Sequence, residues 1–154
     1  MDLARGKVPV APRTGTTCVG VRDVAKGHVA AWKRGRRGER YVLGGENLPW
    51  PKLFAIAAEA LGVKPPRITL SPAWLRAAAI PLDGISKVGF RLDKVSGPAL
   101  RALGVCLYFD GAKAARELGY SPAPMREVLR ETAEDLRRRG LIGASSPRRP
   151  PSAP

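Results

Sequence analysis

The chain has 154 residues, of which 44% are hydrophobic and 26% are charged, a composition that favours one globular domain. Its formal net charge is +14 because 27 Lys and Arg residues face only 13 Asp and Glu residues. No apolar run reaches the eighteen residues of a membrane span, and the first residues lack the apolar centre of a secretory signal. These totals indicate a cytoplasmic protein in which Cys18 and Cys106 are reduced core thiols.

The positive charge raises the possibility of nucleic acid or an acidic surface as a partner. Its densest clusters, residues 33–37 and 137–139, fall where helices are expected to end, and cations stabilise that end of a helix dipole. Few aromatic residues lie among them, and helix-turn-helix, zinc-finger and RNP patterns are missing from the sequence. A solvated basic surface is therefore favoured. A non-catalytic basic module that binds nucleic acid or an acidic partner remains the alternative.

Along the chain, extended and helical patterns alternate at first. Residues 7–17 predict a loop, because proline, glycine and threonine dominate them. Residues 18–21 predict a short strand, after which Asp23 is expected to cap a helix that Gly35 ends. Residues 40–43, Arg-Tyr-Val-Leu, predict a strand buried on both faces, as in a parallel sheet.

The next stretch begins with the pair Gly44 and Gly45, which is interpreted as a turn that needs unusual φ angles. Residues 50–61 predict a helix with Pro51 in its first turn and Gly62 as a left-handed cap. Its expected inner face holds Leu53, Phe54, Ala57, Ala60 and Leu61.

Shorter elements follow in the middle of the chain. Residues 67–70 predict an extended piece and residues 73–80 a short helix that Pro81 ends. Residues 81–104 predict a loop with one short helix near residues 99–103, because glycine and proline interrupt the pattern.

The last third has the clearest signals. Residues 105–109 predict an extended segment, Asp110 a helix N-cap, and Gly119 with Tyr120 a helix end. The final helix, within residues 121–140, is expected to bury Met125, Val128, Leu129, Thr132 and Leu136, with ion pairs Glu134–Arg138 and Asp135–Arg139. Residues 142–154 are expected to be a disordered Pro/Ser/Arg tail.

A search for catalytic motifs finds none. The sequence has no Gly-rich phosphate turn, Walker sequence, Gly-x-Ser-x-Gly elbow or Cys/His cluster, and no tyrosine is followed four residues later by lysine. The single histidine, His28, lies mid-helix and is interpreted as a partly buried structural residue. Catalytic, cofactor-binding and metal-binding residues are therefore all predicted to be absent. The predicted strands are also too few for a stable parallel sheet, so most of such a sheet is missing.

Three motifs in order carry a resemblance: V-x-V-x-D-V-A-x-G-H, G-E-R-Y-x-L-G-G-E-N-L, and F-D-x-x-K-A-x-x-E-L-G-Y. Together they resemble the carboxyl-terminal half of extended short-chain dehydrogenase/reductases, in the NAD-dependent epimerase/dehydratase group, near dihydroflavonol-reductase-like proteins and hopanoid-associated sugar epimerases. The resemblance implies an α/β fold, the carboxyl-terminal fragment of a Rossmann-type fold. Its late parallel strands would be residues 19–21 and 41–43, beside a small, mostly helical substrate-binding lobe.

In that family the amino-terminal half holds the Gly-rich cofactor turn, the catalytic Ser or Thr and the Tyr-x-x-x-Lys pair. This sequence is expected to start just after them. The resemblance thus implies an N-terminal, substrate-facing loop over residues 1–17, the late strands and lobe over 18–141, and the tail over 142–154. NAD or NADP would be the cofactor of the full-length family, and this chain alone is predicted to bind neither and to be inactive.

The resemblance places the substrate, a small molecule, against Pro12, Arg13, Thr14, Thr16 and Thr17. Related nucleotide-sugar epimerases have an arginine before the strand, where this chain has Thr16 or Thr17, and losing that bidentate donor favours a less charged substrate. The expected substrates are a flavonoid-like or steroid-like ketone or a simpler sugar. An ordinary surface loop remains the alternative for these residues. Open strand edges also predict self-association.

Overall fold

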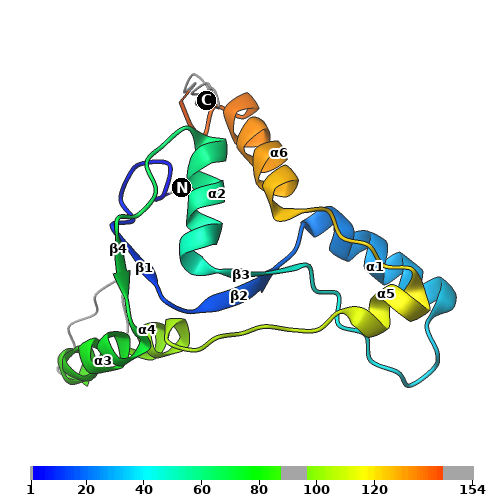
Figure 1. The fold of residues 1–154 in the computed structure, drawn as a ribbon, viewed down its shortest axis with the longest axis horizontal. Helices are drawn as coiled ribbons and strands as arrows, with labels where there is room; N and C mark the ends of the chain where they lie inside the picture. Colours follow the sequence, from blue (N-terminus) through cyan, green and yellow to red (C-terminus); the bar gives the residue numbers. More distant parts are fainter. Residues whose placement is uncertain (1, 88–96, 144–154) are drawn as a thin grey trace, which may run out of the picture.

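The computed structural model describes residues 2–87 and 97–143, and in this part of the chain the helices lie in three pairs around a thin layer of strands (Figure 1). The pairs are α2 with α6, α1 with α5, and α3 with α4. The helices are α1 (Val21–Arg34), α2 (Trp50–Leu61), α3 (Pro72–Lys87), α4 (Gly97–Leu103), α5 (Ala112–Leu118) and α6 (Met125–Arg138). The strands are β1 (Val10–Pro12), β2 (Gly15–Cys18), β3 (Glu46–Pro49) and β4 (Ile68–Leu70). None of these helices is both long and apolar enough to cross a membrane.

The strands pair over long sequence distances. β1 pairs in parallel with β4, and β2 pairs antiparallel with β3. The other edge of β2 makes a parallel bridge between Thr16 and Leu107, where the Leu107 N–H donates to the Gly15 carbonyl at 2.9 Å. The mixture of helices and parallel strands confirms the α/β class. The loop predicted for residues 7–17 is wrong, because β1 and β2 are formed by distant partners that local composition does not reveal.

The strand predicted at residues 40–43 is also wrong, because the pairing of this stretch with another strand starts only at Glu46. Tyr41 and Leu43 pack against α1 and α5, while Val42 between them is exposed. An extended segment becomes a strand only beside another strand, and no described segment pairs with this one. Similarly, Val21 begins α1 instead of ending a strand.

The predicted helix ends are mostly confirmed. Gly62 (φ 73°) and Gly119 (φ 65°) end α2 and α5 in the left-handed conformation. Asp110 lies one residue before the N-cap of α5, and its carboxylate accepts a hydrogen bond from the Ala112 N–H at 2.8 Å. The stop predicted at Pro81 is wrong, because α3 continues to Lys87. Parts of the predicted loop and tail, residues 88–96 and 144–154, lie outside the described residues.

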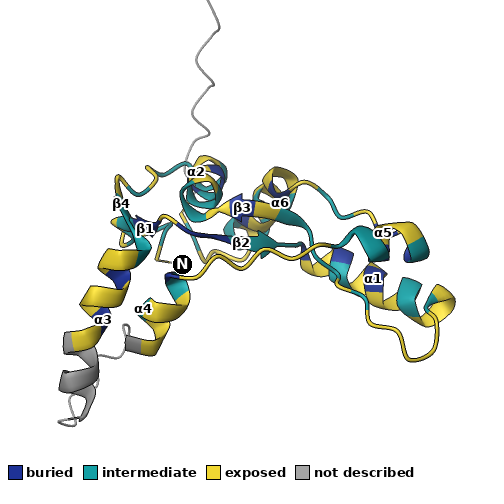
Figure 2. Ribbon diagram, turned by 60° about the horizontal axis from the view of Figure 1, so that its bottom comes forward, coloured by how far each residue is buried: buried dark blue, intermediate teal, exposed yellow. Residues whose placement is uncertain are grey.

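In the part of the chain that the structure describes, buried hydrophobic residues form two small clusters, and Figure 2 colours the buried positions dark blue. The first contains buried Leu48, Ile56 and Met125, and the second contains buried Ala114, Leu118 and Tyr120. Consecutive residues link them, because Cys18 packs on the first cluster and Val19 on the second. The last residue of β2 and the residue that follows it therefore connect the two clusters.

Several predicted core residues lie elsewhere. Met125 and Ala133 are the buried residues of α6, whereas Thr132 is exposed. Cys106 is exposed, and His28 is exposed on α1 with its Nδ1 2.8 Å from the Val24 carbonyl oxygen. Asp135 pairs with Arg139 at 2.7 Å, as predicted.

Candidate functional site

The five residues predicted to face a substrate lie together at the corner between β1 and β2. Pro12 ends β1, Arg13 and Thr14 form the turn, and Thr16 and Thr17 belong to β2. Because β1 and β2 belong to different sheets, this corner is where the two sheets join. The assignment of a substrate to these residues remains a prediction.

Thr14 is buried and holds three elements together. Its Oγ1 donates a hydrogen bond to the Leu103 carbonyl at the end of α4, at 2.6 Å. Its own carbonyl accepts the N–H of Trp50, the first residue of α2, at 2.9 Å. Both polar groups are therefore used by the fold, and Thr14 orients its neighbours.

Arg13 is the exposed charged residue of the corner. Its backbone N–H donates to the Leu70 carbonyl at 2.8 Å, and its Nε donates to the Thr69 hydroxyl at 3.0 Å. These two contacts fix the side chain along β4. A guanidinium held by Nε can still offer its terminal nitrogens to a carbonyl, hydroxyl or anionic oxygen.

Thr17 connects β2 to segment 105–109 through hydrogen bonds. Its hydroxyl accepts the Phe109 N–H at 2.8 Å and donates to the side-chain oxygen of Asn47, whose Nδ2 donates to the Phe109 carbonyl at 3.3 Å. Thr16 makes the backbone bridge to Leu107 on the same segment. Asn47 is thus a polar residue of this corner that the sequence patterns missed, since nothing in its local pattern indicates a partner 62 residues away.

An apolar strip lies beside these threonines. Val105, Leu107, Tyr108 and Phe109 are each about half exposed although they belong to an apolar extended run. The Tyr108 ring covers Gly15 so closely that a Cβ on that glycine would lie 2.1 Å from the tyrosine hydroxyl. The corner therefore presents one guanidinium, ordered threonines and an apolar wall, an arrangement suited to an apolar ring that carries an oxygen.

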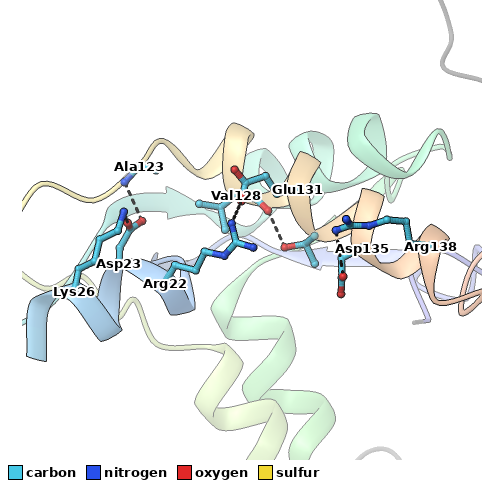
Figure 3. A network of polar contacts seen from close by, with 9 residues as sticks. Arg22, Asp23, Lys26, Ala123, Val128, Glu131, Asp135 and Arg138 are labelled. Atoms are coloured by element: carbon cyan, nitrogen blue, oxygen red, sulfur yellow. Dashed lines mark hydrogen bonds and ion pairs between the residues drawn. The ribbon is translucent and has the colours of Figure 1, made fainter. Parts of the chain in front are cut away.

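A separate groove of about 710 Å³ lies between the start of α1 and α6 (Figure 3). None of the five corner residues lines it. Asp23 is buried at its edge, where its carboxylate accepts the Ala123 N–H at 3.0 Å and lies 3.5 Å from Lys26 Nζ. The predicted cap is therefore wrong: Gly20 is the N-cap of α1, and Asp23 ties α1 to the segment before α6.

The charges of this groove do not suit a dinucleotide. Arg22 pairs with Glu131 at 3.3 Å across it, and Asp135 pairs with Arg138 at 3.4 Å. The carboxylate of Asp23 stands in the first turn of α1, where a pyrophosphate would need free N–H groups and positive potential. The N-terminus of α1 therefore does not fit NAD or NADP.

The thiol of Cys18 is not activated as a nucleophile. Burial and the neighbouring carboxylate of Glu46 raise the pKa of the Cys18 thiol above 9.0, which disfavours the nucleophilic thiolate. In residues 2–87 and 97–143 no cluster of three or more His, Cys, Asp or Glu side chains could hold a metal ion.

The strands and helices define one portion of a Rossmann-type α/β protein, and comparisons with known proteins agree. No protein-family model matches the chain. The chain is 28% identical, over 92% of its length, to a dihydroflavonol 4-reductase-like protein of Synechocystis sp., of which it covers 43%. Among solved structures it is similar to gox2253, at 35% identity with a TM-score of 0.76, covering 92% of this chain and 43% of that one.

A second solved structure, a nucleoside-diphosphate-sugar epimerase from Pseudomonas aeruginosa, is 26% identical with a TM-score of 0.70 over 92% of this chain. The chain spans less than half the length of these relatives. The resemblance drawn from the motifs is confirmed: over 92% of its length the chain is similar to dihydroflavonol-reductase-like proteins and to nucleoside-diphosphate-sugar epimerases, which belong to the NAD-dependent epimerase/dehydratase group. Its coverage fits the carboxyl-terminal half.

Proposed function

We propose that the chain is the substrate-binding portion of an NAD(P)-dependent epimerase/dehydratase or reductase acting on a sugar or a dihydroflavonol-like carbonyl or alcohol. The observation that carries this proposal is the match of 92% of the chain to 43% of a dihydroflavonol 4-reductase-like protein. In such an enzyme the nicotinamide carries the hydride, and the protein supplies binding and alignment. This chain would supply the wall against which the substrate lies.

The substrate side of that wall is the β1–β2 corner, with Pro12, Arg13, Thr14, Thr16 and Thr17. The ordered hydroxyls and the apolar strip of residues 105–109 support a weakly charged, ring-bearing substrate. A nucleotide sugar would instead need a bidentate donor where the chain has Thr16 or Thr17.

The chain alone is proposed to bind no NAD(H) or NADP(H) and to be inactive. The support is electrostatic, because a buried carboxylate occupies the α1 N-terminus and further carboxylates line the neighbouring groove. Calorimetric titration of the purified chain with NADH and NADPH should give no heat of binding. Micromolar binding by the chain alone would contradict this part of the proposal.

The substrate role can be tested in a chimera in which this chain replaces the matching segment of gox2253. The chimera is assayed for NAD(P)H-dependent reduction of dihydroflavonols, steroid ketones and sugars. Arg13→Ala should lower kcat/KM about 10- to 100-fold, because a hydrogen bond from a charged donor contributes about 1.5–3 kcal/mol. Arg130→Ala, at an exposed ion pair of α6, is the matched control and should leave kcat/KM unchanged. Equal kcat/KM for the Arg13→Ala and Arg130→Ala chimeras would show that Arg13 does not contact the substrate.

The net charge of +14 favours a second candidate, a basic module that binds nucleic acid or an acidic partner. Retention on single- and double-stranded DNA and on RNA should be measured between 50 and 200 mM salt, because phosphate contacts lose affinity steeply over about that range. Tight binding that falls with salt by orders of magnitude would favour this candidate.

A further inference from the structure

The end of the molecule formed by α1, α5 and the loop that follows α1 carries a dense basic surface. The two helices lie side by side there, at the opposite end from α3 and α4 (Figure 1). Residues 33–40 and 113–117 contain seven Lys and Arg residues and two glutamates, which gives a local formal charge of +5. More than a third of the net charge of +14 therefore lies at this end.

The two glutamates hold the loop on α5. Glu39 Oε2 lies 2.5 Å from Lys113 Nζ, and Glu117 Oε1 accepts a hydrogen bond from Arg36 Nη2 at 2.8 Å. The Tyr41 hydroxyl donates to the other oxygen of Glu117 at 2.8 Å, and Lys113 Nζ lies 4.8 Å from the centre of the Tyr41 ring. These contacts fix the loop and use its acidic groups.

Five cations at this end are not used in that way. They are Lys33, Arg34, Arg37, Arg40 and Arg116, which we call the basic end patch. Each of these side chains is exposed, and none forms an ion pair with another residue that the structure describes. Like charges at one end of a small protein repel one another, which destabilises the fold unless anions bind there.

Helix dipoles account for only part of the patch. Lys33 and Arg34 lie in the last turn of α1 and Arg116 in the last turn of α5, where cations are favourable. Arg37 and Arg40 come after the end of α1, in the loop, and lie in the last turn of no described helix. Stabilisation of helix ends therefore does not explain their positions.

We propose that the basic end patch binds the phosphodiester backbone of nucleic acid. This inference rests on the second candidate function and is independent of the substrate role. Four of the five cations are arginines, whose planar guanidinium binds two phosphate oxygens at once. The ring of Tyr41 is covered by Lys113 and its hydroxyl is bonded to Glu117, so Tyr41 offers no platform for a base. The patch therefore recognises the backbone, which carries no sequence information.

An acidic protein is a poorer partner for this patch. Protein interfaces enclose a core of apolar and aromatic side chains, whereas the patch consists of cations on two helix ends and a loop. Phosphates also recur along a strand at a spacing of about 3.4 Å, so several cations meet anions at the same time. An anionic lipid surface offers a similar density of charge, so vesicles belong in the test.

Fluorescence anisotropy of the full chain with a labelled DNA duplex and with its single strand tests the proposal. Five phosphate contacts predict that the logarithm of the association constant falls with the logarithm of salt concentration, with a slope of about −4.5 on the duplex and about −3.5 on the single strand. The duplex affinity should therefore fall about 500-fold between about 50 and 200 mM salt. Absence of binding to both DNAs at about 50 mM salt would overturn the proposal.

Charge-neutralising variants locate the binding. Arg37→Gln and Arg40→Gln should each weaken binding and make the salt slope shallower by about 1. Arg76→Gln, at an exposed arginine of α3 at the other end of the molecule, removes the same charge and should leave the slope unchanged. All three variants should unfold at the wild-type temperature, because the side chains are exposed. Equal changes of slope in Arg37→Gln and Arg76→Gln would overturn the proposal, since binding would then follow net charge alone.

Two further outcomes would overturn the proposal in favour of other partners. One is Arg37-dependent binding to polyglutamate that is tighter than binding to DNA of equal charge. The other is Arg37-dependent sedimentation with vesicles of phosphatidylcholine and phosphatidylserine in the absence of DNA binding. The substrate role is tested separately by kcat/KM of the chimera, so nucleic-acid binding and the substrate role can fail independently.

Discussion

Replacing Gly45 by alanine should destabilise the chain far more than replacing its neighbour Gly44. A Cβ built on Gly45 lies 2.2 Å from the Cys18 carbonyl oxygen and 3.1 Å from the Val19 Cα, both backbone atoms that cannot rotate away. A Cβ on Gly44 lies 3.2 Å from Cγ2 of Thr17, a side-chain methyl group. The reason for glycine at position 45 is thus close approach to β2. The predicted need for unusual φ angles is wrong, because neither glycine has a positive φ.

The expected loss of stability depends on which atoms the new methyl group displaces. The new methyl group has to push Gly45 away from β2 at the point where Cys18 pairs with Glu46, the last pair of the β2–β3 ladder. Overpacking typically costs about 1–3 kcal/mol. We expect Gly45→Ala to lie near the upper end, at about 3 kcal/mol, because a backbone oxygen is the obstacle. Gly44→Ala should cost less than about 1 kcal/mol.

Urea unfolding followed by circular dichroism measures both variants against the wild-type chain. A cost of about 3 kcal/mol is a large part of a typical stability of about 5–15 kcal/mol, so the midpoint should shift clearly. The reasoning would be refuted if Gly45→Ala lay within about 0.5 kcal/mol of wild type, or if the two alanine variants were equally stable.

Three further predictions concern buried or paired polar groups. Asp23→Ala should lower the free energy of unfolding by about 1–3 kcal/mol, because the Ala123 N–H loses the carboxylate that accepts its hydrogen bond. Lys26→Ala removes the exposed partner of the same carboxylate and should change the free energy of unfolding by less than about 0.5 kcal/mol. Equal costs in urea unfolding would contradict this. The hydrogen bond from Tyr41 holds the pKa of Glu117 below its usual 4.5, so its contribution to stability is complete above pH 4.5 and is lost as the pH falls through the lowered value. Glu117→Gln should therefore flatten the acid side of a melting-temperature profile measured from pH 7 to 3, and an unchanged acid slope would count against it. Tyr120→Phe should be neutral or stabilising by up to about 1 kcal/mol in the same unfolding assay, because the buried hydroxyl has no partner among the described residues; a loss of stability would show that the hydroxyl is bonded.

Helices and their ends were the most predictable part of the fold. Gly62 and Gly119 are left-handed caps, and the signal for each is local: a glycine directly after an apolar helical repeat. The confirmed pair Asp135–Arg139 also depends on spacing along one helix. Such features need no knowledge of distant segments.

The strands were the least predictable part, for a physical reason. The run at residues 41–43 consists of residues that favour strands, yet without a neighbouring strand among the described residues it forms no ladder. Residues 10–12 look like a loop, yet β1 forms because β4 pairs with it from 58 residues further along. Asp23 shows the same effect, since its partner Ala123 lies 100 residues away and no local pattern distinguishes that role from a cap.

The candidate corner was predicted through family resemblance alone. Arg13 contacts Thr69, and Thr17 contacts Asn47, only because β1 pairs with β4 and β2 pairs with β3. The positions of these residues follow from the pairing of strands distant in sequence, which composition and periodicity do not encode.

The central place of β2 has a consequence for biosynthesis. Thr16 leaves the ribosome 91 residues before its bridge partner Leu107, a delay of about 5–20 s at the usual translation rates of about 5–20 residues per second. Throughout that interval β2 can pair only with β3, so the backbone groups on its other edge have no strand partner. Such late-closing contacts make folding slow and expose the emerging chain to chaperones.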